Sequence, residues 1–154
     1  MTIDAVSHIG VWVHDQEDAK AFYTEKLGFE VRQDATLEEL GNYRWLTVGP
    51  PGQPEVNLIL SVPGPPAMDP DTAKQLLELL AKGALSPGIL RTDDCRAMCK
   101  ELESRGVELT QQPDERFYGV DAALRDPSGN EWRLVQPIEF DLEAMKSQSG
   151  KSTG

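Results

Sequence analysis

Residues 87–94 (PGILRTDD) decide the fold, because they repeat the pattern of residues 8–15 (HIGVWVHD) 79 positions later. In both stretches an apolar strand runs into an aspartate, and a helix with one apolar face follows. Gly28 and Gly106 then end the two helices, and a further strand begins after each. Residues 126–130 (DPSGN) turn the chain into its last strand, as residues 50–54 (PPGQP) do in the first half. A pattern of this length that occurs only twice predicts a duplicated βαβββ module, since a solenoid needs three or more stacked repeats.

The size and charge of the chain exclude several classes of protein. Its 154 residues are enough to bury one core without disulfides, and its formal net charge is −11. An acidic field repels phosphate backbones, so we expect no nucleic-acid partner, whereas a cationic ligand is not discouraged. Cys95 and Cys99 lie four apart on one predicted helix face, which favours reduced, packed thiols over a disulfide or a zinc site.

The predicted organisation is a single domain over residues 1–140, with module one at 4–62, a linker helix at 69–83 and module two at 84–137. Asp15, Asp69 and Asp94 are expected to cap three helices, with Pro70 at the first position of the linker helix. Residues 34–42 are polar and acidic and are predicted to form a loop. Residues 141–154 lack apolar periodicity and are expected to be disordered. The N-terminus has no basic and apolar leader, and no apolar run approaches the roughly 20 residues of a membrane span, so we expect no membrane partner and a cytoplasmic location.

Several motifs of the chain agree in order with one family. The duplicated module, the opening strand at residues 8–13, Phe22-Tyr23 before Leu27-Gly28-Phe29 and the turn at residues 126–130 together resemble the vicinal oxygen chelate superfamily. This group includes glyoxalase I, bleomycin-resistance proteins, fosfomycin-resistance enzymes and extradiol dioxygenases. The resemblance covers residues 4–137. It implies an α+β fold in which two βαβββ modules form a cupped, barrel-like mixed sheet with helices outside, and it implies a homodimer.

The resemblance also implies where a metal would be held. Enzymes of the superfamily bind one divalent ion through side chains on the first and last strands of each module. His8 is the one ligand type among the four matching positions, because the others are Pro87, Asn57 and Arg133. A proline has no donor side chain, and a guanidinium cannot ligate a cation. We therefore expect no cofactor. The alternative is a divalent metal (Zn, Fe, Mn or Ni) at a displaced site.

The side chains expected to face the cavity suggest what it binds instead. Strand alternation turns Trp12 inward from the first module and Arg91 and Arg133 inward from the second. Two buried arginines need counter-charges, so either Glu55 and Glu131 neutralise them or an anionic ligand does. In related glyoxalases an arginine at the position of Arg91 binds the substrate's anionic end. The predicted ligand-binding residues are Trp12, Trp45, Asn57, Arg91 and Arg133.

The sequence is compatible with three functions. The favoured one is a protein that binds a small organic, and by this reasoning anionic, molecule in the sheet cavity without chemistry, although the acidic charge also fits a cationic antibiotic. The second is a metal-dependent lyase, isomerase or ring-cleaving dioxygenase of the glyoxalase type with displaced ligands. The third is a metal-free enzyme with Glu55 or Glu131 as general base beside Arg133, for which burial must raise the carboxylate's pKa.

Overall fold

The computed structural model describes residues 1–149, and its elements follow the predicted order in both halves of the chain. The first module consists of β1 (His8–Trp12), α1 (Gln16–Ala21), the π-helical turn η1 (Phe22–Lys26), β2 (Glu30–Leu37), the 3₁₀ turn η2 (Glu38–Leu40), β3 (Tyr43–Gly49) and β4 (Asn57–Ser61). The linker is α2 (Pro70–Ala81). The second module consists of β5 (Ile89–Arg91), α3 (Cys95–Ser104), β6 (Glu108–Arg116), β7 (Gly119–Arg125) and β8 (Glu131–Pro137), and α4 (Leu142–Ser149) follows it.

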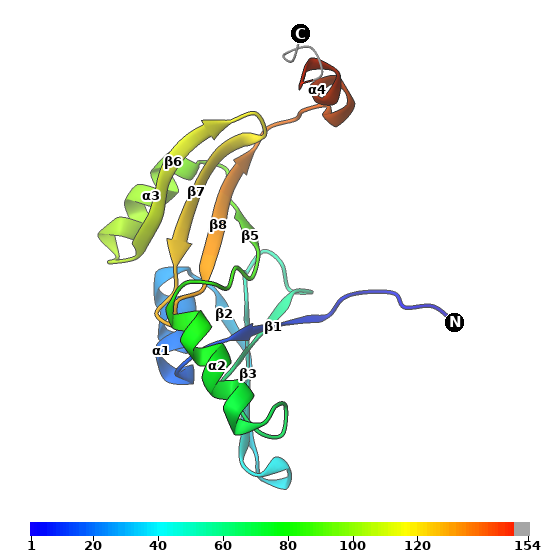
Figure 1. Cartoon of the computed structure of the whole chain (residues 1–154), viewed down its shortest axis with the longest axis vertical. Coiled ribbons are helices and arrows are strands. Elements are labelled where there is room, and N and C mark those ends of the chain that lie inside the picture. Colours follow the sequence, from blue (N-terminus) through cyan, green and yellow to red (C-terminus); the bar gives the residue numbers. More distant parts are fainter. Residues whose placement is uncertain (150–154) are drawn as a thin grey trace.

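The two modules have the same strand order, which confirms the predicted duplication. The first sheet is ordered β1-β4-β3-β2 and the second β5-β8-β7-β6, and in each the first and last strands of the module pair in parallel. The eight strands therefore form two cupped four-stranded sheets that do not close into a barrel. Figure 1 shows the two sheets one above the other, with α1 and α3 on the same side. The opposite side of each sheet is called its open face below.

Side-chain caps begin the three helices where the sequence predicts them. The Asp15 carboxylate accepts a hydrogen bond from the Asp18 backbone N–H (2.9 Å), and Asp94 accepts one from Ala97 (3.0 Å). Asp69 caps α2 in the same way, with Pro70 at the first helical position. Gly28, with φ +76°, ends the first helix in the left-handed region as expected.

The modules share one apolar core between their sheets and helices. One cluster of buried side chains contains members of both, such as Tyr23 and Leu60 from the first and Leu102 and Trp132 from the second. Cys99 lies in this core and, like Cys95, is free and buried, as predicted. Burial raises the pKa of the Cys99 thiol to about 12, so the thiol is protonated and unreactive at neutral pH.

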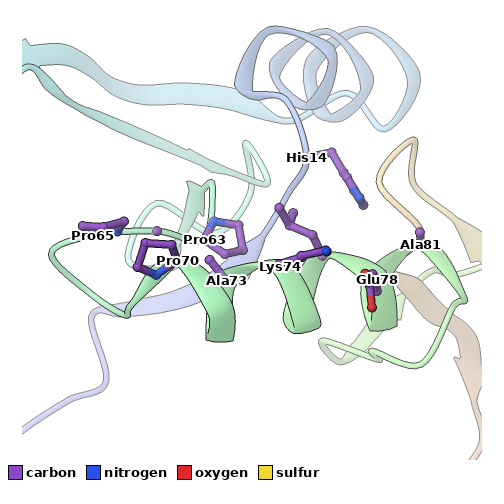
Figure 2. A pocket seen from close by; sticks show the side chains of 10 residues that line it. His14, Pro63, Pro65, Pro70, Ala73, Lys74, Glu78 and Ala81 are labelled. Carbon is purple, nitrogen blue, oxygen red and sulfur yellow. The ribbon is translucent and has the colours of Figure 1, made fainter.

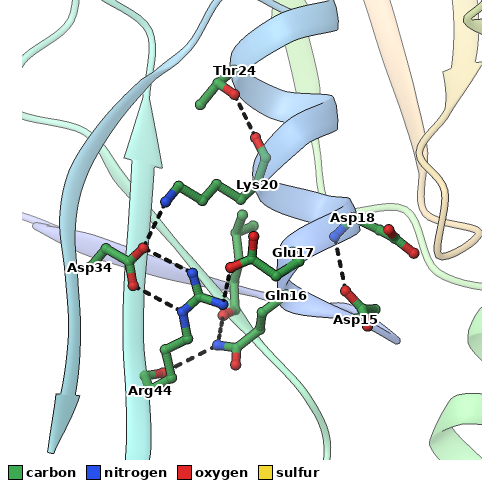
Figure 3. A network of polar contacts seen from close by, with 9 residues as sticks. Asp15, Gln16, Glu17, Asp18, Lys20, Thr24, Asp34 and Arg44 are labelled. Carbon is green, nitrogen blue, oxygen red and sulfur yellow. Dashed lines mark hydrogen bonds and ion pairs between the residues drawn. The ribbon is translucent and has the colours of Figure 1, made fainter.

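Residues 34–37 belong to a strand, contrary to the prediction of a loop at residues 34–42, whereas residues 38–42 form a turn that connects β2 to β3. Residues up to Leu37 continue β2 and pair with β3, with Asp34 opposite Leu46. Ion pairs hold this polar stretch in place, since the Asp34 carboxylate contacts Arg44 and Lys20 at 2.9 Å, and Glu17 also contacts Arg44 (Figure 3). The hydrogen bonds from Arg44 and Lys20 hold the pKa of Asp34 well below its usual range. The polarity of the segment reflects its solvent-facing ion pairs and not irregular backbone.

The end of the chain also differs from the expectation of a disordered tail at residues 141–154. Residues 142–149 form α4, which begins where the Asp141 carboxylate accepts a hydrogen bond from the Glu143 backbone N–H (2.9 Å). Local capping of this kind does not depend on the apolar periodicity on which the prediction was based. Residues 150–154 lie outside the described residues. Within residues 1–149, every helix is too short or too polar to cross a lipid bilayer.

Candidate functional site

The open face of the first sheet carries the side chains that the sequence turns inward from β1. Val11 is buried in the core, so alternation places His8 and Trp12 on the opposite, open face. In the parallel pair with β4, His8 lies opposite Asn57 and Trp12 lies opposite Ser61. His8 and Trp12 therefore share the side of β1 that points away from the core.

Aromatic rings gather on this face. The centroids of the His8 and Trp45 rings are 5.5 Å apart, and the Trp45 indole N–H donates to the Gln33 side-chain oxygen at 2.8 Å. Trp12 and Trp45 are both half-buried, so each presents part of its ring to solvent. The Tyr43 hydroxyl is hydrogen-bonded to the Ser61 hydroxyl at 3.0 Å. The arrangement offers flat apolar surface with a few hydrogen-bonding groups, which suits an organic ring system.

The donor set near His8 does not fit a divalent metal within one chain. The exposed His8 Nδ1 contacts the Ser7 hydroxyl at 2.9 Å, and the Asn57 amide donates to the Ser7 carbonyl at 3.2 Å. Between residues 1 and 149, no group of three or more His, Cys, Asp or Glu side chains is placed to hold a metal ion. Such sites need three or four protein donors, so we derive no chemical step through a metal.

The strand register changes one of the four positions at which the sequence comparison expected a metal ligand: the position assigned to Asn57 belongs to Ile59, two residues later. Gly10 and Ile89 are equivalent in the repeat, and they pair with Ile59 and Arg133 respectively. The residue that corresponds to Arg133 in the first module is therefore Ile59, not Asn57. The loops before β4 and β8 differ in length, which hides this shift in the sequence. Isoleucine has no donor atom, so the correction leaves His8 still without companions.

Arg133 lies on the open face of the second sheet and finds its counter-charges within the chain. Its guanidinium forms an ion pair through two nitrogens with Asp121, including Nε to Oδ1 at 3.2 Å, and donates to the Gln111 side chain at 2.9 Å. Its third nitrogen lies 3.6 Å from Glu131. The Tyr118 hydroxyl donates to the same Asp121 carboxylate at 2.6 Å.

The charges in this cluster stabilise one another. Burial alone would raise the pKa of Asp121, but hydrogen bonds from Arg133 and Tyr118 more than offset it and the pKa is lowered. The hydrogen bond to Asp121 raises the pKa of Arg133, and the same carboxylate raises the pKa of Tyr118. At neutral pH the cluster holds a carboxylate, a guanidinium and a neutral phenol.

The remaining predicted residues lie apart from one another. Arg91 is exposed on the edge strand β5, opposite Val135, and makes no ion pair with any other described residue. Glu55 is exposed in the turn before β4, so the strand alternation used to place it beside Asn57 does not apply. Trp12 and Trp45 are on the first sheet, and the two arginines are on the second.

Comparisons with known proteins agree with this fold. The model of the Glyoxalase/Bleomycin resistance protein/Dioxygenase superfamily matches residues 5–134. The chain belongs to this superfamily. The structure of UcmS2 is 45% identical, with a TM-score of 0.81, over 88% of this chain and 99% of UcmS2. TnmS3, an antibiotic binding protein from Streptomyces sp. CB03234, is 37% identical, with a TM-score of 0.69, over 90% of this chain and 99% of TnmS3. An uncharacterised protein of Bacillus subtilis, YurT, is 31% identical over 82% of this chain and 94% of its own length.

The sequence-based prediction of site residues did not include Asp121, which is the main partner of Arg133. Asp121 is buried and is the one charged residue in the apolar run from residue 120 to 124. A lone carboxylate in such a strand must be paired, so this pattern is a usable signal for a buried ion pair. Gln111 and Tyr118 gave no comparable signal, because their roles depend on the pairing of β6 with β7.

A groove of about 510 Å³ lies elsewhere, between α2 and the segment that follows β4. Its walls are mainly proline, alanine and leucine side chains, and Figure 2 shows His14, Lys74 and Glu78 around it. None of the ligand residues predicted from the sequence lines this groove. The candidate site of this superfamily member is therefore the pair of open sheet faces.

Proposed function

We propose that this protein binds a small organic molecule of the antibiotic type on its open sheet faces, without a metal and without chemical conversion. The proposal draws on TnmS3, the antibiotic binding protein that is 37% identical over 90% of this chain. It draws equally on the site, where aromatic surface is present and metal donors are not grouped among the described residues. A binding protein of this kind protects its host by sequestration and needs no catalytic group.

The observation that carries the proposal is that two tryptophans, Trp12 and Trp45, are half-buried on the sheet face that points away from the core. Aromatic side chains in a soluble protein are normally used for the core, and Trp132 shows that use here at 4% exposure. The half-buried Trp45 indole beside His8, together with the half-buried Trp12 on the same sheet face, would provide the stacking surface that organic ligands require.

We also propose that a second copy of the chain covers the open faces. Small-molecule sites bury most of the ligand's surface, which an open sheet cannot do. Light scattering in solution should give twice 17.0 kDa, and a monomer at micromolar concentration would contradict the proposal.

A binding screen tests the proposed function. Bleomycin and a set of aromatic antibiotics are each added to the purified protein while its tryptophan fluorescence is measured. Each compound is then recovered, and its molecular mass is measured by mass spectrometry. We expect saturable quenching by at least one compound, which is recovered unchanged. Absence of binding below millimolar concentration, or recovery of a converted product, would contradict the proposal.

The two free, buried cysteines fit the cytoplasmic location that we propose for this activity.

A further inference from the structure

The second open face has no free positive charge at Arg133. The Nε–H group and both N–H groups of one terminal nitrogen are directed to Asp121 and Gln111, and the other nitrogen faces Glu131 at 3.6 Å. Two carboxylates therefore surround one guanidinium, and the cluster carries a formal charge of about −1 at neutral pH. An anionic ligand would have to compete with Asp121, whose side chain is only 4% exposed.

Arg133 remains partly accessible, since its side chain is 30% exposed. Three of its five N–H groups are hydrogen-bonded, and the two on the remaining terminal nitrogen lie near the Glu131 carboxylate at 3.6 Å, whose charge repels an incoming anion. The two residues paired with it on the neighbouring strands are apolar: Ala123 on β7, and Ile89 on β5 at 70% exposure. A planar cation that is hydrogen-bonded through two of its three nitrogens and has apolar side chains beside it can stack with an aromatic ring.

We propose that Arg133, held by Asp121, Gln111 and Glu131, is a stacking platform that selects planar aromatic ligands which are uncharged or cationic and discriminates against anionic ones. This inference rests on the proposed function and names the chemical class of its ligand. Asp121 is then a positioning residue, because it fixes the guanidinium and cancels its charge. The sequence alone left this choice open between an anion clamp and an internal ion pair.

Arg91 is the other arginine on this face, and it has no ion pair with a described residue. It is exposed on an edge strand, where water and salt screen its charge. Its contribution to anion binding is therefore expected to be small. The variant Arg91→Gln measures that contribution separately.

Three planar probes of equal ring size test the proposal: 9-aminoacridine as the cation, 9-anthracenemethanol as the neutral ring and 9-anthracenecarboxylate as the anion. Their affinities for the full-length protein are measured by fluorescence at pH 7.5. We expect the cation and the neutral ring to bind about tenfold or more tightly than the anion. Equal or tighter binding of the anion overturns this inference alone, because the antibiotic screen can still succeed.

Variants of the cluster separate charge from structure. Asp121→Asn keeps the shape of the side chain but releases the charge of Arg133, so anion affinity should rise about tenfold and cation affinity should fall. Glu30→Gln is the matched control, since it removes one negative charge from the exposed partner of Arg32 on β2 and should leave the ratio of cation affinity to anion affinity unchanged. Glu131→Gln changes the half-exposed partner of Arg133 and should lower the ratio of cation affinity to anion affinity, as Asp121→Asn does, but by less. It provides the test if Asp121→Asn does not fold.

Two further outcomes complete the test. Arg133→Met removes the planar cation and should weaken all three probes, whereas loss of discrimination without loss of neutral-ring binding would overturn the stacking role. Binding of none of the probes to the wild-type protein also overturns this inference. In that case the antibiotic screen alone decides the proposed function.

Discussion

Replacing Asp126 with alanine is expected to lower the free energy of unfolding by about 3–5 kcal/mol, because this buried carboxylate organises the contact between the two modules. One carboxylate oxygen accepts hydrogen bonds from the backbone N–H groups of Ser128, Gly129 and Asn130 at 2.9–3.0 Å. The other accepts one from the Tyr23 hydroxyl, 103 residues away, at 2.7 Å. Without the carboxylate, these buried donors lose their acceptor.

The same turn is joined to the first module at two other points. The Asn130 side chain donates to the Trp12 carbonyl at 2.8 Å, and the Ser128 hydroxyl accepts from the His14 backbone N–H at 2.9 Å. Burial, followed by the charge of Asp126, raises the pKa of Tyr23 well above its ordinary value, so the phenol stays a donor at physiological pH. The turn thus holds the first open face in position relative to the second.

Urea unfolding monitored by circular dichroism measures the effect of Asp126→Ala. Asp15→Ala is the control, because it also removes an aspartate that accepts a backbone hydrogen bond, but at an exposed helix cap. Loss of such a cap costs about 1 kcal/mol. Equal losses for the two variants would show that the module contact does not depend on the Asp126 carboxylate.

Replacing Trp45 with alanine is expected to weaken binding of the antibiotic found in the screen by 10- to 100-fold, since stacking on a large aromatic ring contributes roughly 1–3 kcal/mol. Trp45 is half-buried on the open face, where its ring contacts His8 and its indole N–H donates to Gln33. Trp45→Phe keeps an aromatic ring without the N–H and should retain most of the affinity.

Titration calorimetry of the two Trp45 variants checks this expectation, with melting temperatures to confirm that both fold. Phe117→Ala is the control, because Phe117 is an exposed aromatic residue (56%) that packs against Tyr118 and Phe140 at the turn between β6 and β7. Its affinity should equal that of the wild type. A similar loss in Phe117→Ala and Trp45→Ala would place the ligand elsewhere.

The local signals in the sequence were sufficient for the fold. The capping aspartates Asp15 and Asp94, the glycine stops and the apolar strands each act within a few residues, and their repetition at a fixed offset revealed the duplicated module. The prediction was wrong for residues 34–37, where polarity was interpreted as a loop. In the structure these residues continue β2, held by the contacts of Asp34 with Arg44 and Lys20, 10 and 14 positions away.

The site was less predictable because it depends on long-range pairing. Strand alternation predicted that His8, Trp12 and Arg133 face a cavity, and the strand register places them on the sides of their sheets that point away from the core. The partner of Arg133 could not be chosen in the same way, since Asp121 becomes its neighbour only when β7 pairs with β8. The role of Asp126 was hidden for the same reason: its partner Tyr23 is on a helix of the other module.

The two halves of the duplication have diverged in chemistry while keeping one topology. The first open face presents rings around Trp45, whereas the second presents the charged cluster around Arg133. A ligand between two such faces would have aromatic rings on one side and the Arg133 cluster on the other.

The most direct test of metal-free binding is the affinity of the antibiotic found in the screen, measured by titration calorimetry before and after exhaustive dialysis of the protein against EDTA. We expect the same Kd within a factor of two, and no change when Zn²⁺, Fe²⁺, Mn²⁺ or Ni²⁺ is added back. Binding that disappears on chelation and returns with one of these ions would contradict the account.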